Sequence, residues 1–182
     1  MKRALFFIAY AALSINMHAQ IYIAKSCEIS FFSPTSVEDI AGINKITKPL
    51  LNTTTGDLQI RITVSAFVFE KPLMQEHFNE NYLESDKFPN AFFKGKINEK
   101  IDYTKDGEHK VTATGKFTIH GVEKEKTING VLTVKGDQIT MSSTFKIVFA
   151  DYNIVIPALQ SAIIPADTEV KLNAVLEPYK KN

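Results

Sequence analysis

The most constraining feature of this sequence is an alternation of apolar and polar residues, with a period of two, through three successive segments. These segments run from Lys110 to Ile119, from Lys126 to Lys135 and from Ile139 to Phe149. A period of two places successive side chains on opposite faces of an extended chain, as in a half-buried strand. His120-Gly121 and Gly136-Asp137 separate the segments and favour tight turns. The sequence therefore predicts three consecutive antiparallel strands that form a meander.

Four further segments have the pattern of strands. They run roughly from Ile21 to Phe32, from Leu58 to Phe69, from Ala91 to Ile101 and from Glu169 to Leu176. Many short strands and few helices in one domain of this length are typical of a closed barrel or a sandwich. A strand count near eight favours a barrel that is just wide enough to be filled by side chains or to hold one small ligand. We therefore predict an all-β, antiparallel, eight-stranded barrel.

The segment that begins at Leu58 changes phase near its end. Phe67 and Phe69 fall on the face opposite to the preceding apolar residues. A β-bulge adds one residue to a strand and reverses the faces of the residues after it. We therefore expect a bulge near Ser65-Ala66 that returns both rings to the inner face.

Helical signals are confined to two short stretches. Thr35-Ser36 stands before two acidic residues and resembles a helix N-terminus, which predicts a short helix over Val37 to Gly42. Between Pro72 and Ser85, apolar residues recur at spacings of three and four. This spacing indicates one or two short helical turns.

The N-terminus has the pattern of a secretory signal peptide. A basic start at Lys2-Arg3 precedes an apolar run from Ala4 to Leu13, and a small residue, Ala19, comes after it. An apolar first strand or an uncleaved anchor are the alternatives, but the run is shorter than the roughly 20 apolar residues that span a bilayer. We expect residues 1–19 to be removed, leaving residues 20–182 as one barrel domain in the bacterial periplasm or medium.

Composition excludes several classes of partner. The net charge is +1, so removal of Lys2 and Arg3 leaves a nearly neutral chain with no basic excess for nucleic acid. No later apolar run is long enough for stable membrane insertion. The single cysteine, Cys27, cannot form an internal disulfide and is expected to be a small buried hydrophobic residue. The oligomeric state stays open, a dimer included.

No motif in the sequence indicates catalysis. His77, His109 and His120 lie in different predicted elements, and no H-x-H, C-x-x-C or H-E-x-x-H spacing occurs. A nucleophile elbow, a phosphate loop and a dinucleotide fingerprint are also missing from the sequence. We therefore predict no enzyme activity, no catalytic residue, no metal site and no cofactor.

Three stretches carry a resemblance to a known family. They are Phe67 to Gly95, with Phe88-Pro89 before Ala91-Phe92-Phe93-Lys94-Gly95, then Gly115 to Lys124, and then Asp151-Tyr152-Asn153-Ile154. The chain resembles the YceI-like family of exported polyisoprenoid-binding proteins, in length and order over nearly the whole expected mature chain. The resemblance implies a lipocalin-like barrel with one or two short helical segments, whose apolar interior accommodates an isoprenoid tail.

Candidate ligand contacts come from two features. Small residues at inward positions leave room for a cavity, although strand glycines also serve bends and bulges. Aromatic residues and Met74 in one third of the chain form either a flexible apolar mouth or plain core. The candidate cavity-lining residues are Phe67, Phe69, Met74, Phe78, Phe92, Ala113, Gly115, Phe117, Gly130 and Phe145.

Three functions remain in competition at this point. The favoured one is an exported binding protein that holds a long apolar isoprenoid or other lipid ligand. The alternatives are an exported stress-related or structural barrel with a solid core, and a barrel enzyme of low activity. A continuous apolar cavity separates the first from the solid barrel, and two polar side chains converging inside that cavity would indicate an enzyme.

We expect N-terminal analysis of the exported protein to find Gln20 as the first residue, free or cyclised, because cleavage occurs after the small residue Ala19. Edman sequencing or mass spectrometry of the periplasmic or secreted fraction measures this directly. An intact Met1 in that fraction would contradict the prediction.

Overall fold

The computed structural model describes residues 20–158 and 160–180, and the expected signal peptide lies outside them. The strands are β1 (Ile21–Ser33), β2 (Ile40–Asn44), β3 (Leu50–Asn52), β4 (Asp57–Thr63), β5 (Asn90–Ile97), β6 (Gly107–Ile119), β7 (Val122–Lys135), β8 (Gln138–Val148) and β9 (Asp167–Pro178). All neighbours pair antiparallel, and β6, β7 and β8 form the predicted meander.

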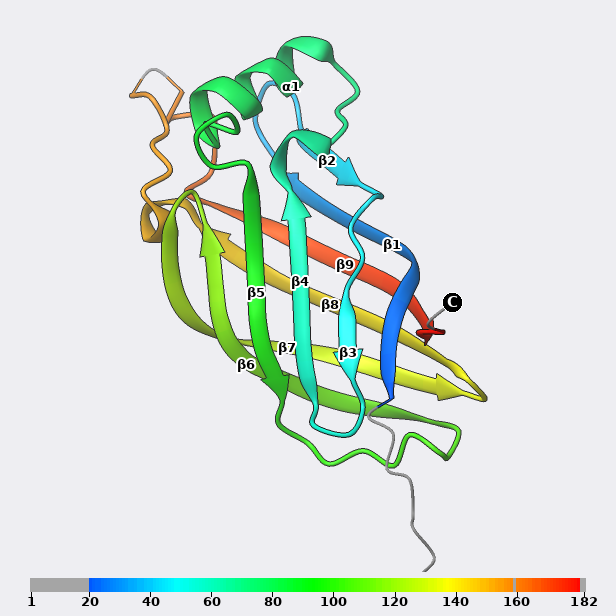
Figure 1. Cartoon of the computed structure of the whole chain (residues 1–182). Coiled ribbons are helices and arrows are strands. Elements are labelled where there is room, and N and C mark those ends of the chain that lie inside the picture. The colour runs from blue at the N-terminus through cyan, green and yellow to red at the C-terminus, as the bar shows by residue number, and fades with distance from the viewer. Residues whose placement is uncertain (1–19, 159, 181–182) are drawn as a thin grey trace, which may run out of the picture.

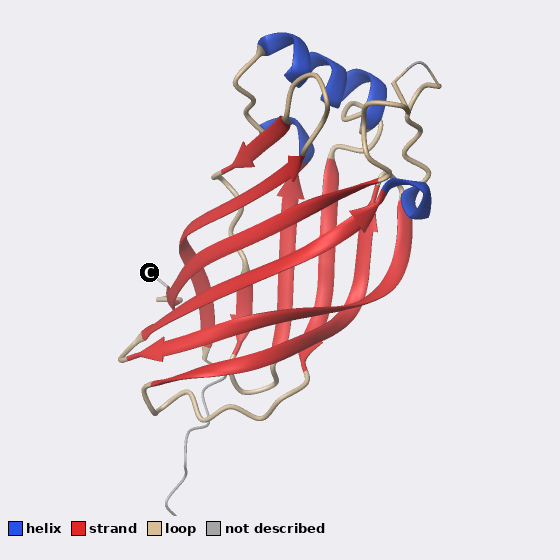
Figure 2. Cartoon of the chain, turned by 180° about the vertical axis from the view of Figure 1, so that it is seen from behind, coloured by secondary structure: helices blue, strands red, loops and turns tan. Residues whose placement is uncertain are grey.

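These strands close into a barrel with eight positions. β1 pairs with β9 from Tyr22 and Pro178 to Phe32 and Glu169, which joins the two ends of the sheet. β2 and β3 pair with opposite ends of β1, so the two short strands share one position in the ring. The closed, tilted ring of strands is visible from both sides (Figures 1 and 2). The predicted all-β, eight-stranded antiparallel barrel is confirmed.

A buried amide bridges the break between β2 and β3. Asn44 is fully buried, and its Nδ2 donates to the Thr63 carbonyl oxygen at 3.0 Å, at the end of β4. Its Oδ1 accepts from the backbone N–H groups of Ile46 and Thr47 at 3.1 and 3.3 Å, and from the Thr47 hydroxyl at 3.0 Å. Because buried backbone groups need partners, this side chain replaces the missing ladder bonds.

A bulge in β1 sets which of its side chains face inward. The register with β9 shifts between Ala24 and Ser26, and Lys25 and Ser26 are both exposed. Tyr22 and Ala24 are buried before the shift, and Cys27 begins a second buried series after it. One extra residue thus restores the inner face after a change of phase.

Close contact between two strands explains Gly115, and corrects the expectation that it lines a cavity. A Cβ at Gly115 would collide with the Cα of Gly95 on β5 and with the Lys94 carbonyl oxygen. Gly95 and Gly115 are direct ladder partners. The two glycines therefore let β5 and β6 approach each other and leave no open space between them.

The helix expected over Val37 to Gly42 is wrong. The Thr35 hydroxyl accepts from the backbone N–H groups of Val37 and Glu38 at 3.2 and 3.0 Å, and the chain then enters β2. The same kind of side chain that caps a helix also closes a short turn. Pairing with β1 holds the next residues extended, so the turn leads into a strand and not into a helix.

The bulge expected near Ser65-Ala66 is also wrong, although its consequence holds. β4 ends at Thr63, and a 3₁₀ turn, η1 (Val64–Ala66), redirects the chain. Phe67 and Phe69 are both buried after this turn. The turn, rather than a bulge within a longer strand, brings the rings to the interior.

The helical turns expected between Pro72 and Ser85 are confirmed as α1 (Pro72–His77) and the π-helical turn η2 (Phe78–Tyr82). They lie across one end of the barrel, beside the segment that leads from η3 (Phe149–Tyr152) to β9 (Figure 1). Residues from this side of the barrel therefore form a roof over one end of its interior.

A histidine clamp holds three loops together at the roofed end. His120 Nδ1 lies 3.1 Å from the Tyr152 carbonyl oxygen, and Nε2 lies 2.8 Å from Glu84 Oε2. The Tyr152 carbonyl and the Glu84 carboxylate are both hydrogen-bond acceptors, so the His120 ring lies between two acceptors from different loops. The Phe88 ring packs edge-on at 4.6 Å, and a Cβ at Gly121 would strike it. All three stretches that carry the family resemblance therefore meet in this clamp.

We expect Gly115→Ala to lower the free energy of unfolding by about 1–3 kcal/mol, because its Cβ meets backbone that must move. Denaturant midpoints measure the loss. Gly107→Ala is the matched control on the same strand, since its Cβ meets only a side chain at an ordinary 3.5 Å. A Gly115→Ala protein as stable as Gly107→Ala would contradict the strand contact.

The clamp also predicts a pH dependence. The hydrogen bond from His120 lowers the pKa of Glu84 below its usual 4.5. A lowered folded-state pKa contributes stability above the unfolded value, and the contribution is lost as pH falls through the folded value. Glu84→Gln should therefore lower the melting temperature at pH 7 by at most a few degrees, and this effect should shrink as the pH falls below 4.5. A difference that persists undiminished at pH 3 would refute the ionic part of the clamp.

Candidate ligand cavity

An apolar cavity of about 410 Å³ occupies the roofed half of the barrel. Its walls come from inward positions of β1, β4, β5, β6, β7, β8 and β9. The wall residues include Ile29, Leu58, Ile60, Ile62, Phe93, Ile97, Val111, Ala113, Phe117, Met141, Ile147, Val170 and Leu172. Below it the barrel is solid, since Leu51, Ile139 and Leu176 have no exposed surface and do not border the cavity.

An aromatic cluster forms part of the roof. The ring of Phe31 stacks on Phe78 at 5.4 Å between centroids, and Phe67 and Phe69 lie 5.5 and 5.6 Å from Phe31. Met74 on α1 also borders the cavity. Such ring pairs pack like core rather than as an open mouth, so the roof is an ordered layer.

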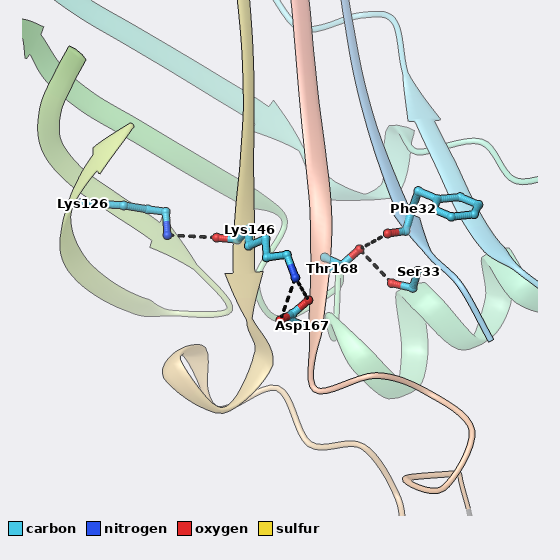
Figure 3. A network of polar contacts seen from close by, with 6 residues as sticks. All are labelled: Phe32, Ser33, Lys126, Lys146, Asp167 and Thr168. Atoms are coloured by element: carbon cyan, nitrogen blue, oxygen red, sulfur yellow. Dashed lines mark hydrogen bonds and ion pairs between the residues drawn. The ribbon is translucent and has the colours of Figure 1, made fainter. Parts of the chain in front are cut away.

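Two pairs of polar side chains on the wall bond to each other. Ser33 Oγ donates to Thr168 Oγ1 at 2.8 Å, and Thr168 Oγ1 donates to the Phe32 carbonyl oxygen at 3.1 Å (Figure 3). Tyr82 donates its hydroxyl to Gln160 Oε1 at 2.7 Å. These four polar side chains are therefore satisfied within the wall, and most of the other wall residues are apolar, so the interior suits apolar groups.

Charge is confined to the rim. Glu38, His77 and Tyr82 are the titratable side chains that border the cavity, and Glu38 forms an ion pair with Lys71. Burial raises the pKa of Tyr82, so its phenol stays protonated and keeps the bond to Gln160. A ligand within this cavity therefore meets no unpaired charge on the deeper wall.

Seven of the ten candidate residues border the cavity: Phe67, Met74, Phe78, Ala113, Phe117, Gly130 and Phe145. The other three lie elsewhere. Phe69 packs in the aromatic cluster behind the wall, and Gly115 touches β5. Phe92 points outward, because its neighbour Phe93 takes the buried position on β5 and the Lys94 ammonium lies over the Phe92 ring.

Sequence reasoning missed one part of the wall. Ile154, Ile156, Ile163, Ile164 and Gln160 border the cavity from the loop between η3 and β9. This segment is rich in isoleucine and carries two prolines, but it has no period of two or of 3.6. An apolar stretch without a period is a signal that a loop is covering core.

Other chemistry has little support within the described part of the chain. Among these residues no three His, Cys, Asp or Glu side chains gather as they would around a metal ion. No helix in residues 20–158 and 160–180 is long and apolar enough to cross a bilayer. Cys27 is buried as expected, and burial raises the pKa of its thiol to about 11.

Comparison with known proteins identifies relatives of the same shape. A polyisoprenoid binding domain from Saccharophagus degradans superimposes with a TM-score of 0.71 at 15% identity, covering 87% of this chain and 98% of that one. BcnA from Burkholderia cenocepacia gives 0.69 at 17% identity, covering 82% and 95%. The YCEI protein of Campylobacter jejuni gives 0.53 at 18% identity, covering 100% of both chains. At these identities the likeness shows the fold alone.

A search of curated protein sequences finds no match. The sequence model of the YceI-like domain, by contrast, matches residues 23–177, which span β1 to β9. The predicted resemblance is confirmed, and this chain belongs to the YceI-like domain family.

Proposed function

We propose that this protein is an exported, non-enzymatic binding protein that holds a long apolar molecule, an isoprenoid or another lipid, inside its barrel. The cavity of about 410 Å³ is the observation that carries the proposal, because its wall is mainly apolar and two pairs of its polar side chains, Ser33–Thr168 and Tyr82–Gln160, bond to each other. Its size falls within the roughly 300–1,000 Å³ of pockets that hold one small molecule. The relative described as a polyisoprenoid binding domain supports the ligand class, and the pattern of residues 1–19 supports export.

Hydrophobic burial is strong enough for this role. Each buried CH₂ contributes about 0.8 kcal/mol, so a five-carbon isoprene unit offers up to roughly 3–4 kcal/mol. Micromolar affinity needs about 8 kcal/mol, and association costs about 4–15 kcal/mol. A chain that buries roughly four to six isoprene units therefore binds without any ionic contact.

The two alternatives fit the structure less well. A solid structural barrel would fill the space that this cavity leaves between Leu58 and Val170. A barrel enzyme needs polar groups that converge on a substrate, and here Ser33 bonds Thr168 while Tyr82 bonds Gln160. Neither pair includes a general base.

We expect Ala113→Phe to weaken binding of a twenty-carbon isoprenoid alcohol about tenfold or more, because the added ring enters the cavity from its wall. Isothermal titration or displacement of a fluorescent apolar probe measures the affinity. The barrel should stay folded, because the ring enters space that no other side chain occupies.

Phe92→Ala is the matched control, since its ring lies on the outer face, and it should leave the affinity unchanged. Mass spectrometry of the organic extract of natively purified protein should also find a lipid with a branched apolar chain. A folded Ala113→Phe protein with unchanged affinity, together with an extract free of lipid, would remove the proposed function.

A further inference from the structure

The barrel wall has a seam between β7 and β8. The ladder that joins these strands runs only from Gly130 and Ser143 to Lys135 and Gln138. Residues 122–129 of β7 and 144–148 of β8, all of them described, have no ladder partner on each other's strand. β7 pairs with β6 from Val122 to Val134, and β8 pairs with β9 from Ile139 to Val148. The seam is thus a local parting of two otherwise well-paired strands, in the roofed half of the barrel.

Two lysines stand along the seam where apolar residues would close the interior. Lys126 lies opposite Gly115 and Lys124 lies opposite Phe117, so both occupy inward positions of β7. In an intact wall these positions would face the core, where an unpaired ammonium is costly. Inward-pointing charge is also a device that prevents an open strand edge from pairing. The sequence thus keeps β7 and β8 apart in this half.

The two ammonium groups cross the seam instead. Lys126 Nζ donates to the main-chain carbonyl oxygen of Lys146 at 3.0 Å, a reach visible in Figure 3. Lys124 Nζ donates to Asp151 Oδ1 at 2.7 Å on η3. Among the described residues, no carboxylate lies within ion-pair distance of Lys126, so one hydrogen bond from this ammonium spans the middle of the seam.

The cavity reaches the seam. Gly130 and Ser143, the last ladder pair, both border it, and Phe145 and Ile128 border it just beyond that pair. Asn129 also borders it, although its side chain alternates outward. Gly130 and the small Ser143 leave little more than backbone between the cavity and the surface here. The last ladder pair therefore forms a thin wall at the start of the opening.

The two ends of the barrel are closed in other ways. At the far end, Leu51, Ile139 and Leu176 form a plug with no exposed surface. At the roofed end, the aromatic cluster and the bond from Tyr82 to Gln160 join η2 to the loop before β9. Of these three barriers, the seam is the one where the two strands are unpaired and hydrogen bonds from side chains bridge the gap.

We propose that the β7–β8 seam is a side opening of the cavity, through which the apolar ligand enters and leaves, and that Lys126 is its latch. This inference rests on the proposed binding function. The opening motion is a parting of residues 122–129 from 144–148, which breaks no ladder bond between these strands because none joins them. The main polar cost is loss of the Lys126 bond to Lys146, of the Lys124 bond to Asp151 and of the bond from Ser143 Oγ to the Asn129 carbonyl oxygen.

Two reversible cross-links test the route. Lys124→Cys with Asp151→Cys locks the seam, and Tyr82→Cys with Gln160→Cys locks the roof, because each pair of side chains already meets. A short bis-methanethiosulfonate reagent joins each pair and is removed by a reductant. Native Cys27 is buried, and its raised pKa, about 11, keeps it out of the reaction.

The readout is the uptake rate of a twenty-carbon isoprenoid alcohol that carries an anthraniloyl fluorophore. We expect the linked seam to slow uptake roughly tenfold or more, and reductant to restore it, while the linked roof keeps the rate of its own reduced form. Uptake that is equally fast with the seam linked and reduced would overturn the proposal. Uptake stopped by the roof link would assign entry to the roof and would overturn it as well.

Single substitutions test the latch. Lys126→Met should speed release of the same probe up to roughly tenfold, because it removes a charge-assisted hydrogen bond but keeps a long apolar stem. Lys146→Met is the matched control, since Lys126 bonds to the main chain of that residue and not to its ammonium. Equal release rates in both variants and the wild type would refute the latch. A wild-type protein that binds no probe would instead remove the binding function, and the side opening with it.

Discussion

Pairing of the first strand with the last is the constraint on which the rest of this structure depends. β1 and β9 join from Tyr22 to Phe32, and β1 also carries β2 and β3, so one strand organises three neighbours. Closure removes the free edges of the sheet and sets the width of the interior through the number of strands. Once the width is set, side-chain volume at each level decides whether the lumen is filled or hollow.

Side-chain volume divides this barrel into two levels. Leucine and isoleucine side chains meet in the plug around Leu51 and Leu176, which supplies a core that does not depend on a ligand. Above the plug the walls are apolar but do not meet, and the opposing residues leave a cavity that short polar pairs such as Ser33–Thr168 do not fill. The plug that stabilises the barrel and the cavity therefore lie at different heights of the same barrel, so the packing of the plug does not depend on what fills the cavity.

Much of the fold could be predicted, because an alternation of apolar and polar residues directly indicates half-buried strands. The site could be predicted only in part. Phe92 and Phe93 are both aromatic, so the pattern could not say which ring faces inward until pairing with β4 and β6 fixed the faces. A glycine such as Gly115 gives the same signal in the sequence whether it makes room for a cavity or lets two strands approach each other closely. Contact with Gly95 on the neighbouring strand shows that close approach is the reason here. Thr35 forms a turn where its sequence equally suits a helix cap, because the next strand must pair with β1.

At Lys124 and Lys126, the alternation of apolar and polar residues can be interpreted only once the pairing of the strand is known. On β7 the inward series runs from Val134 to Ile128 with apolar residues or glycine, and then turns to lysine. By sequence alone this change indicates the end of a buried strand, yet β7 continues beside β6 to Val122. The two lysines are tolerated at inward positions only because β8 does not pair with β7 there. Their ammonium groups can therefore reach the Lys146 carbonyl oxygen and the Asp151 carboxylate. The polarity of the inward face of β7 thus determines where β7 and β8 are joined by a backbone ladder and where side chains bridge them.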